Sequence, residues 1–192
     1  MSSSFSFITD ARPTGIVSVA AASAALALRV LHGVLEIAAR RHTAGAIAEL
    51  LDSTTREAQN LVRLAEEDGE VYAAYMQARR ARSANLQAAL HRAIESPLAA
   101  ARSAAAGIDL CGKALPFFQG AIAADVAGAA IVLSGAVRAI LCCVDANLRA
   151  VKDETFARAI EAETHALKQR AIREGQALAE ALRKPKDPLR EP

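Results

Sequence analysis

One acidic residue, Asp125, interrupts a long apolar segment and is the first candidate for chemistry in the chain. The segment covers residues 121–144, and the helical neighbours of Asp125 within it are the small or apolar residues Ala121, Ala129 and Val132. A carboxylate buried among such side chains must find a hydrogen-bond donor or be protonated. Two interpretations stay open: Asp125 caps another helix or pairs with an arginine, or it is an acid with a tuned pKa at a ligand site.

A second acidic candidate, Asp68, lies in a run of charged residues at 63–70. Four acidic residues within five positions of a helix typically form a solvated face, and Arg63 precedes Glu67 by the spacing of a helical ion pair. Periodicity alone therefore gives Asp68 no special role. Another set of polar residues lies on one helix face, at spacings of three and four: Arg138, Cys142, Asp145 and Arg149. Such a stripe is more typical of an exposed surface or a subunit contact than of an active site.

Residues that commonly bind metals or act as nucleophiles are few and scattered. The cysteines, Cys111, Cys142 and Cys143, form no Cys-x-x-Cys motif and have no histidine at zinc-ligand spacing. Adjacent cysteines do not readily bridge each other, so we expect buried, reduced thiols in a cytoplasmic protein. The sequence has no glycine-rich phosphate loop and no nucleophile elbow, and we expect no metal site and no permanently bound cofactor.

The composition limits the elements that can position these residues. Alanine accounts for 47 of the 192 residues, tryptophan is absent, and aromatic residues make up only 4%. Because alanine favours helices and is a poor strand former, we predict an all-α fold. Helices faced with alanine approach closely but each buries little area, which favours pairing with a second copy of the chain. The formal charge of +2 shows no electrostatic signature of nucleic-acid binding.

Two apolar segments, residues 16–31 and 121–144, raise the question of membrane insertion. The first lacks the basic flank of a signal peptide, since the charges of Asp10 and Arg12 cancel. The second is long enough to span a bilayer, but it contains Asp125 and Arg138, which are costly at membrane depth. We expect it to be a helix buried almost all round in a soluble bundle, and we expect no membrane partner.

Periodicity and breakers predict one helical domain over residues 15–183, between a flexible N-terminus at 1–14 and a disordered tail at 184–192. Ser96 and Pro97 resemble an N-cap followed by proline at the first helical position, and Asp153 suits a helix N-terminus. The predicted architecture is an antiparallel bundle of five or six helices. The expected helices cover residues 18–41, 46–79, 84–95, 96–113, 121–148 and 153–182.

Five segments, in the same order and with similar spacing, resemble the cyclodeaminase/methenyltetrahydrofolate cyclohydrolase family, which includes the cyclodeaminase half of formiminotransferase-cyclodeaminase. Residues 12–21 are similar to the family segment Pro-Thr-Pro-Gly-Gly-Gly-Ser-Val-Ala-Ala, and residues 64–72 to Leu-Ala-Asp-Glu-Asp-Ala-Glu-Ala-Phe. Asp125, in the similar segment 119–130, matches a family Asp, and Asn147 matches a family Asn. The other similar segments are residues 87–98 and 147–156, and the resemblance covers residues 12–170.

The resemblance implies a homodimer that acts on the methenyl or formimino group of tetrahydrofolate, with the tetrahydrofolate derivative bound as substrate. It implies Asp68 and Asp125 as catalytic acid and base, since carboxylates can stabilise an amidinium-like carbon and move a proton to water or nitrogen. The substrate-binding residues that it implies are Gly15, Ile16, Val17, Ser18, Gln119 and Arg41.

Departures from the family pattern leave two other functions open. Ile16 and Val17 stand where the family has glycine, and Ala124 stands where the family has the serine before its Asp. A pocket made more apolar in this way favours another small molecule with a C=N bond or an amine. The third alternative is a non-catalytic helical scaffold that kept the dimer and lost the site.

Overall fold

The computed structural model describes residues 15–40 and 45–182, so the predicted flexible segment 1–14 and the tail 184–192 lie outside the described residues. The described chain forms five α-helices, one short 3₁₀ helix and no strand, which confirms the all-α prediction. These elements are α2 (Ile16–Ala39), α3 (Gly45–Arg80), α4 (Leu86–Ala114), η1 (Leu115–Phe117), α5 (Gly120–Leu148) and α6 (Glu154–Ala181).

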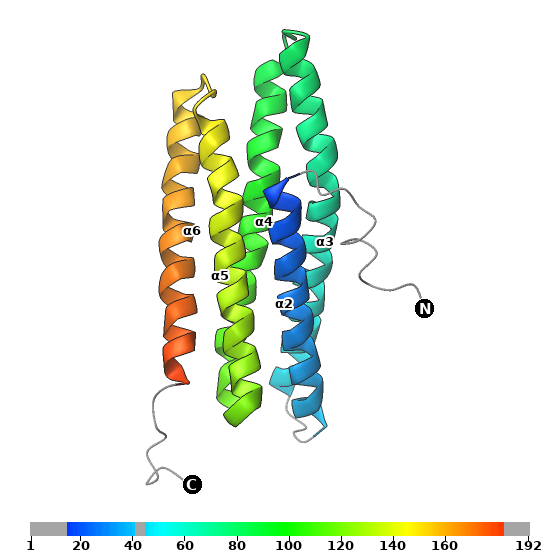
Figure 1. The fold of residues 1–192 in the computed structure, drawn as a ribbon, viewed down its shortest axis with the longest axis vertical. Coiled ribbons are helices and arrows are strands. Elements are labelled where there is room, and N and C mark those ends of the chain that lie inside the picture. Colours follow the sequence, from blue (N-terminus) through cyan, green and yellow to red (C-terminus); the bar gives the residue numbers. More distant parts are fainter. Residues whose placement is uncertain (1–14, 41–44, 183–192) are drawn as a thin grey trace, which may run out of the picture.

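The helices run up and down the long axis of the molecule and form an antiparallel bundle (Figure 1). Helix α2 packs against α3 and α5, and α4 packs against the same two helices. Helix α6 lies beside α5 at the edge of the bundle and also reaches α4. Helix α5 therefore contacts three helices, and together with α2 it carries most of the apolar segments noted in the sequence.

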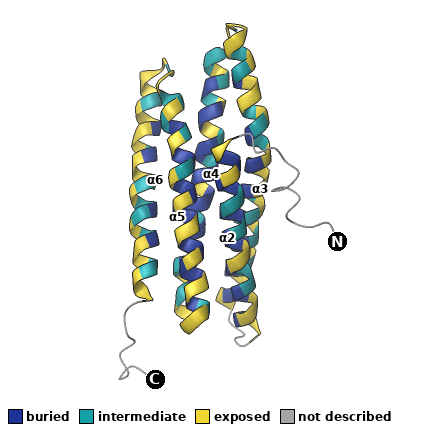
Figure 2. Ribbon diagram, viewed as in Figure 1, coloured by how far each residue is buried: buried dark blue, intermediate teal, exposed yellow. Residues whose placement is uncertain are grey.

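Small side chains let these helices approach closely, as the alanine content predicts. An added Cβ at Gly107 on α4 would lie 3.0 Å from side-chain atoms of both Leu28 and Leu133. An added Cβ at Gly175 on α6 would lie 2.9 Å from the Cβ of Ser134 on α5. Both glycines thus mark places where two helices touch too closely for a side chain. The buried residues line the faces between helices (Figure 2).

One predicted helix boundary is wrong, because α4 continues as a single helix through Pro97. Proline has no N–H, so the carbonyl four residues earlier, that of Ala93, loses its usual helical partner. The Nδ2 group of Asn147 on α5 donates to this carbonyl oxygen at 3.0 Å and replaces the missing donor. A side chain 54 residues along the chain thus keeps α4 continuous, and the bundle has five α-helices.

The remaining predicted boundaries agree with the observed helices within two residues. The start of α6 is confirmed in detail, since the Asp153 carboxylate accepts hydrogen bonds from the backbone N–H groups of Thr155 and Phe156. The loop expected at residues 115–120 contains the 3₁₀ turn η1. Local capping signals were therefore reliable where no distant side chain was involved.

Two helices, Ile16–Ala39 and Gly120–Leu148, are long and apolar enough by length and composition to cross a membrane. We compared burial over the most apolar 18-residue stretch of each helix. Only 50% of that stretch is buried in α2, and 56% in α5. The expectation that α5 is buried almost all round is therefore wrong for the single chain. The expectation that the protein has no membrane partner stays a prediction.

We predict that Asn147→Ala lowers the free energy of unfolding by about 1–3 kcal/mol, because the Ala93 carbonyl is left buried without a donor. Urea unfolding followed by circular dichroism measures the change. In a Pro97→Ala background, an N–H returns at position 97 and the loss caused by Asn147→Ala should largely disappear. An equal loss in both backgrounds would contradict this explanation of the continuous α4.

Candidate active site

A buried hydrogen bond between Ser18 and Asp68 joins the first turn of α2 to α3. The Ser18 hydroxyl donates to Oδ2 of Asp68 at 3.0 Å, and the two residues are only 3% and 8% exposed. The interpretation of Asp68 as part of a solvated face is wrong. Leu61, Leu64, Ala65 and Asp68 follow helical spacing along the buried side of α3, whereas Glu66 and Glu70 are exposed.

The spacing of apolar residues could have shown that Asp68 is buried. Leu61 and Leu64 mark the inward face of α3, and Asp68 continues that face one turn later. The surrounding acidic residues hid this signal, because a cluster of charges is typical of solvent exposure. The sequence prediction recovered Asp68 only through the family resemblance.

The surroundings of Asp68 shift its acidity. Burial raises the pKa of the Asp68 carboxyl above its ordinary value, and the hydrogen bond from Ser18 offsets part of this rise. Burial also raises the pKa of the Cys143 thiol on α5, to which the negative charge of Asp68 adds. The Cys143 thiol is thereby held neutral and is a poor nucleophile. Asp68 is thus the group here with the properties of a proton donor and acceptor.

A cavity of about 260 Å³ adjoins Asp68 and is formed by four helices. Three of the predicted substrate-binding residues, Gly15, Ile16 and Val17, line it from the start of α2. Its other walls come from α3, α4 and α5, through Val71, Tyr72, Ala93, Pro97, Cys143, Ala146 and Asn147. The bond between Asn147 and the Ala93 carbonyl therefore lies in the wall of this cavity.

A neighbouring cavity of about 410 Å³ shares Tyr72, Ala146 and Asn147 with the first. Tyr72, Tyr75 and Arg79 line it at intervals of three and four residues along α3. This second space therefore combines aromatic side chains with a cation. The order of these groups along α3 is an acid, two aromatic rings and a cation. It matches a molecule that exchanges a proton at one end, has a flat aromatic middle and carries a negative charge at the other end.

The predicted residues Gln119 and Asp125 lie elsewhere in the chain. Both are exposed near the start of α5, and Asp125 precedes Cys143 by 18 residues, or about 27 Å along the helix axis. The expectation that Asp125 is buried is wrong for the single chain, because its side of α5 has no helix packed on it. Arg41 lies outside the described residues.

The cysteines also differ from the expectation of three buried thiols. Cys111 is buried, and its burial raises the thiol pKa to about 12, but Cys142 is exposed and Cys143 is half-buried. Within residues 15–40 and 45–182, no three side chains of His, Cys, Asp or Glu group closely enough to hold a metal ion.

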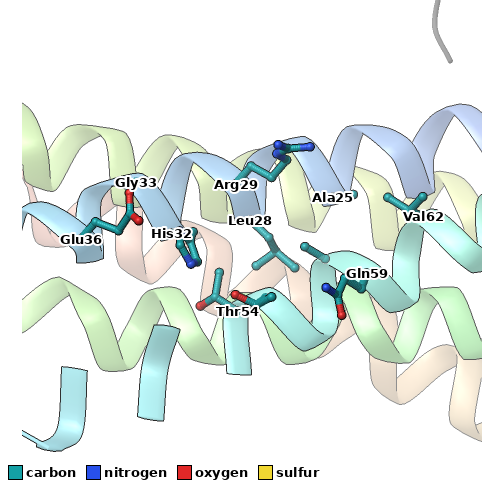
Figure 3. Close-up of a pocket in the computed structure, with 11 residues that line it drawn as sticks. Ala25, Leu28, Arg29, His32, Gly33, Glu36, Thr54, Gln59 and Val62 are labelled. Atoms are coloured by element: carbon teal, nitrogen blue, oxygen red, sulfur yellow. The ribbon is translucent and has the colours of Figure 1, made fainter. Parts of the chain in front are cut away.

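A separate cavity of about 540 Å³ lies between α2 and α3 and was not predicted from the sequence (Figure 3). His32 projects from α2 towards the side of α3 that carries Thr54, whose buried hydroxyl has no hydrogen-bond partner among the described residues. Arg29 and Glu36 stand along the same groove. This cavity contains none of the residues that the family resemblance predicts, so we do not assign the reaction to it.

Comparison with known proteins identifies the family and the fold of the chain. The family model described as Formiminotransferase-cyclodeaminase matches residues 11–166. The chain belongs to this family. The crystal structure of formiminotetrahydrofolate cyclodeaminase from Thermotoga maritima has the same fold, with a TM-score of 0.83, 21% sequence identity and coverage of 93% of each chain. A search of curated proteins found no match.

We predict that Asp68→Asn raises the free energy of unfolding at neutral pH. The pKa of Asp68 is raised on folding, so its favourable contribution is complete below the ordinary value of 3.8 and is lost as the pH rises through the folded-state pKa. Asparagine can still accept the Ser18 hydrogen bond but never ionises. Urea unfolding of both proteins should give nearly equal stability at about pH 3 and a growing advantage for the variant towards pH 7. A pH-independent difference would contradict the raised pKa.

Proposed function

We propose that this member of the family is an enzyme that acts on the methenyl or formimino group of a tetrahydrofolate derivative. The observation that carries the proposal is Asp68, a buried acid with a raised pKa beside a cavity that the first turn of α2 lines. The family membership supports the class of substrate. We further propose that the enzyme is cytoplasmic and works as a homodimer.

The chemistry of such a substrate suits a single buried carboxyl group. The methenyl or formimino carbon is bonded to two nitrogens and shares a positive charge with them. The Asp68 carboxylate stabilises that charge when the substrate binds, because the cavity has a lower dielectric than water. The raised pKa of Asp68 also helps the same group to accept and return a proton during turnover.

Both reactions of the family's substrates require the same proton movements. In hydrolysis, water adds to the methenyl carbon and Asp68 accepts a proton from that water. One C–N bond then breaks as its nitrogen is protonated, and the added oxygen loses its remaining proton and forms the formyl C=O bond. In deamination, the second bridging nitrogen of the tetrahydrofolate, which lies outside the ring system, attacks the formimino carbon and loses its proton. The C–N bond to the departing nitrogen then breaks, and that nitrogen leaves as ammonia after Asp68 donates a proton. Asp125 takes no part within one chain, since it lies far along α5.

The neighbouring cavity is the proposed binding site for the rest of the folate molecule. We assign the faces of Tyr72 and Tyr75 to the aromatic part of the substrate, and the Arg79 guanidinium to its carboxylate end. Asp68 and Arg79 lie 11 residues apart on α3, or about 16 Å along the helix axis. This spacing suits a long substrate that carries its reactive group at one end and its negative charge at the other.

A second candidate is another small molecule with a C=N bond or an amine. It is favoured by Ile16 and Val17, which line the cavity where the family motif has glycine and whose branched side chains make the cavity smaller and more apolar. Calorimetric titration with a tetrahydrofolate derivative separates the two candidates. Binding supports the first, whereas no binding to a folded, Asp68-containing protein supports the second candidate or a scaffold.

We predict that Asp68→Asn lowers the rate of methenyltetrahydrofolate decay, followed by absorbance, by at least about 100-fold. The matched control is Glu66→Gln, which neutralises an exposed acid two residues away and should leave the rate unchanged. A wild-type protein with no rate above buffer on either the methenyl or the formimino substrate would overturn the proposed activity.

A further inference from the structure

The cavity between α2 and α3 is large enough for a small molecule and lies away from the Asp68 cavity. Its volume of about 540 Å³ is typical of a small-molecule site. Thr54 in its wall and Asp68 lie 14 residues apart on α3, or about 21 Å along the helix axis. Of the described residues, none lines both cavities. A molecule bound between α2 and α3 therefore does not touch Asp68, and its binding does not depend on the proposed reaction.

The buried hydroxyl of Thr54 is the first indication of a ligand. Thr54 is 0% exposed, and its hydroxyl has no hydrogen-bond partner within residues 15–40 and 45–182. The hydroxyl of its neighbour Thr55 donates to the Leu51 carbonyl, so a threonine in this part of α3 can pair with its own backbone, yet Thr54 does not. A buried polar group without a partner is costly. A polar group bound in this cavity would supply that partner.

Gly33 on α2 is the second indication. It lines the same cavity, and a Cβ added there would meet nothing within 4 Å. Its φ is not positive, so neither its backbone conformation nor a close helix contact requires glycine. Glycine destabilises a helix interior relative to alanine. The missing side chain leaves free space on the cavity side of α2, next to His32, where a ligand can lie directly against the helix (Figure 3).

Two opposite charges flank this free space. Arg29 lies four residues before Gly33 and Glu36 lies three residues after it, so all three lie on one side of α2. Both charged side chains are exposed, and neither forms an ion pair with another residue of the described chain. A cation and an anion about one helical turn to either side of a cavity suit a ligand that carries both charges. A carboxylate matches Arg29, and an ammonium group matches Glu36.

The end of the cavity opposite Glu36 is apolar. Figure 3 shows Ala25 and Val62 at that end. The described residues that line it are aliphatic and come from both helices: Ala25, Leu28, Ala58 and Val62. An apolar group placed there is removed from water, which favours binding. The ligand that fits the whole cavity thus has a zwitterionic part and an apolar part.

We propose that the cavity between α2 and α3 binds a free α-amino acid with an apolar side chain. Arg29 binds its carboxylate, Glu36 binds its ammonium group, and the Thr54 hydroxyl donates to the carboxylate above Gly33. The apolar side chain occupies the apolar end of the cavity. A carboxylic acid without the amine is repelled by Glu36, and an amine without the carboxylate is repelled by Arg29, so the pair of charges selects the zwitterion.

An NMR titration of the full chain with L-leucine tests the proposal without any assay of turnover. The backbone amide signals of Gly33 and Thr54 should shift as L-leucine is added, with half-saturation below about 1 mM. The acid 4-methylpentanoate is leucine without its amine, and 3-methylbutylamine is leucine without its carboxylate. Each should bind at least about 10-fold more weakly than L-leucine. No shift at about 10 mM L-leucine, or equal binding of either analogue, would overturn the proposal.

Charge removal tests where the amino acid binds. Arg29→Gln and Glu36→Gln should each weaken L-leucine binding by at least about 10-fold, because each removes a charge-assisted hydrogen bond. The matched controls are Arg158→Gln and Glu161→Gln at exposed positions of α6, which should bind L-leucine as the wild type does. Wild-type affinity in both Arg29→Gln and Glu36→Gln would place the amino acid outside this cavity and overturn the proposal.

Gly33→Leu tests the free space independently of charge. The added side chain enters the cavity without meeting an atom at its Cβ, so the variant should keep its helical content by circular dichroism and lose L-leucine binding. A folded Gly33→Leu protein with wild-type affinity would contradict the proposed position of the ligand. Asp68→Asn should bind L-leucine normally, so loss of turnover and loss of amino-acid binding are separate results.

Discussion

The buried hydrogen bond from Ser18 to Asp68 is the interaction on which the site depends. It holds a carboxyl group away from water at the point where α2 begins, and it links that point to the middle of α3. Small or apolar side chains of α2, α4 and α5 lie around this polar pair, and the hydrogen bond within the pair offsets part of the cost of burying it there. Burial raises the pKa of Asp68, which helps the carboxyl group to exchange a proton. The same burial makes the ionised carboxylate costly in the folded protein, so stability and reactivity oppose each other at Asp68.

Most of the fold could be predicted from the sequence, because helix formation and capping depend on neighbouring residues. Alanine content predicts helices, and Asp153 marks the start of α6 by a contact within three residues. Pro97 misled the prediction because the donor that satisfies Ala93 comes from Asn147 on another helix. A distant compensating contact of this kind leaves no trace in local periodicity.

The site was less predictable, because burial depends on which helices pack together. Asp68 carries the same charge as its exposed neighbours, and only its place on the Leu61–Leu64 face of α3 sets it apart. Asp125 shows the opposite error, since an apolar segment suggested burial where α5 has an open side. A sequence pattern alone does not show whether a small-residue helix face is covered by its own chain or by another.

The contact between Asn147 and the Ala93 carbonyl couples two positions that would otherwise vary independently. Among relatives, a proline at the position of Pro97 should occur together with an amide side chain at the position of Asn147. Relatives without the proline do not need that amide, because the backbone N–H can bind the carbonyl instead. Both residues lie in the wall of the Asp68 cavity, so a substitution at either position changes the shape of the cavity and the continuity of α4 at the same time. Changes in substrate preference should therefore arise more readily at Ile16, which lines the same cavity but is half exposed and makes no such contact.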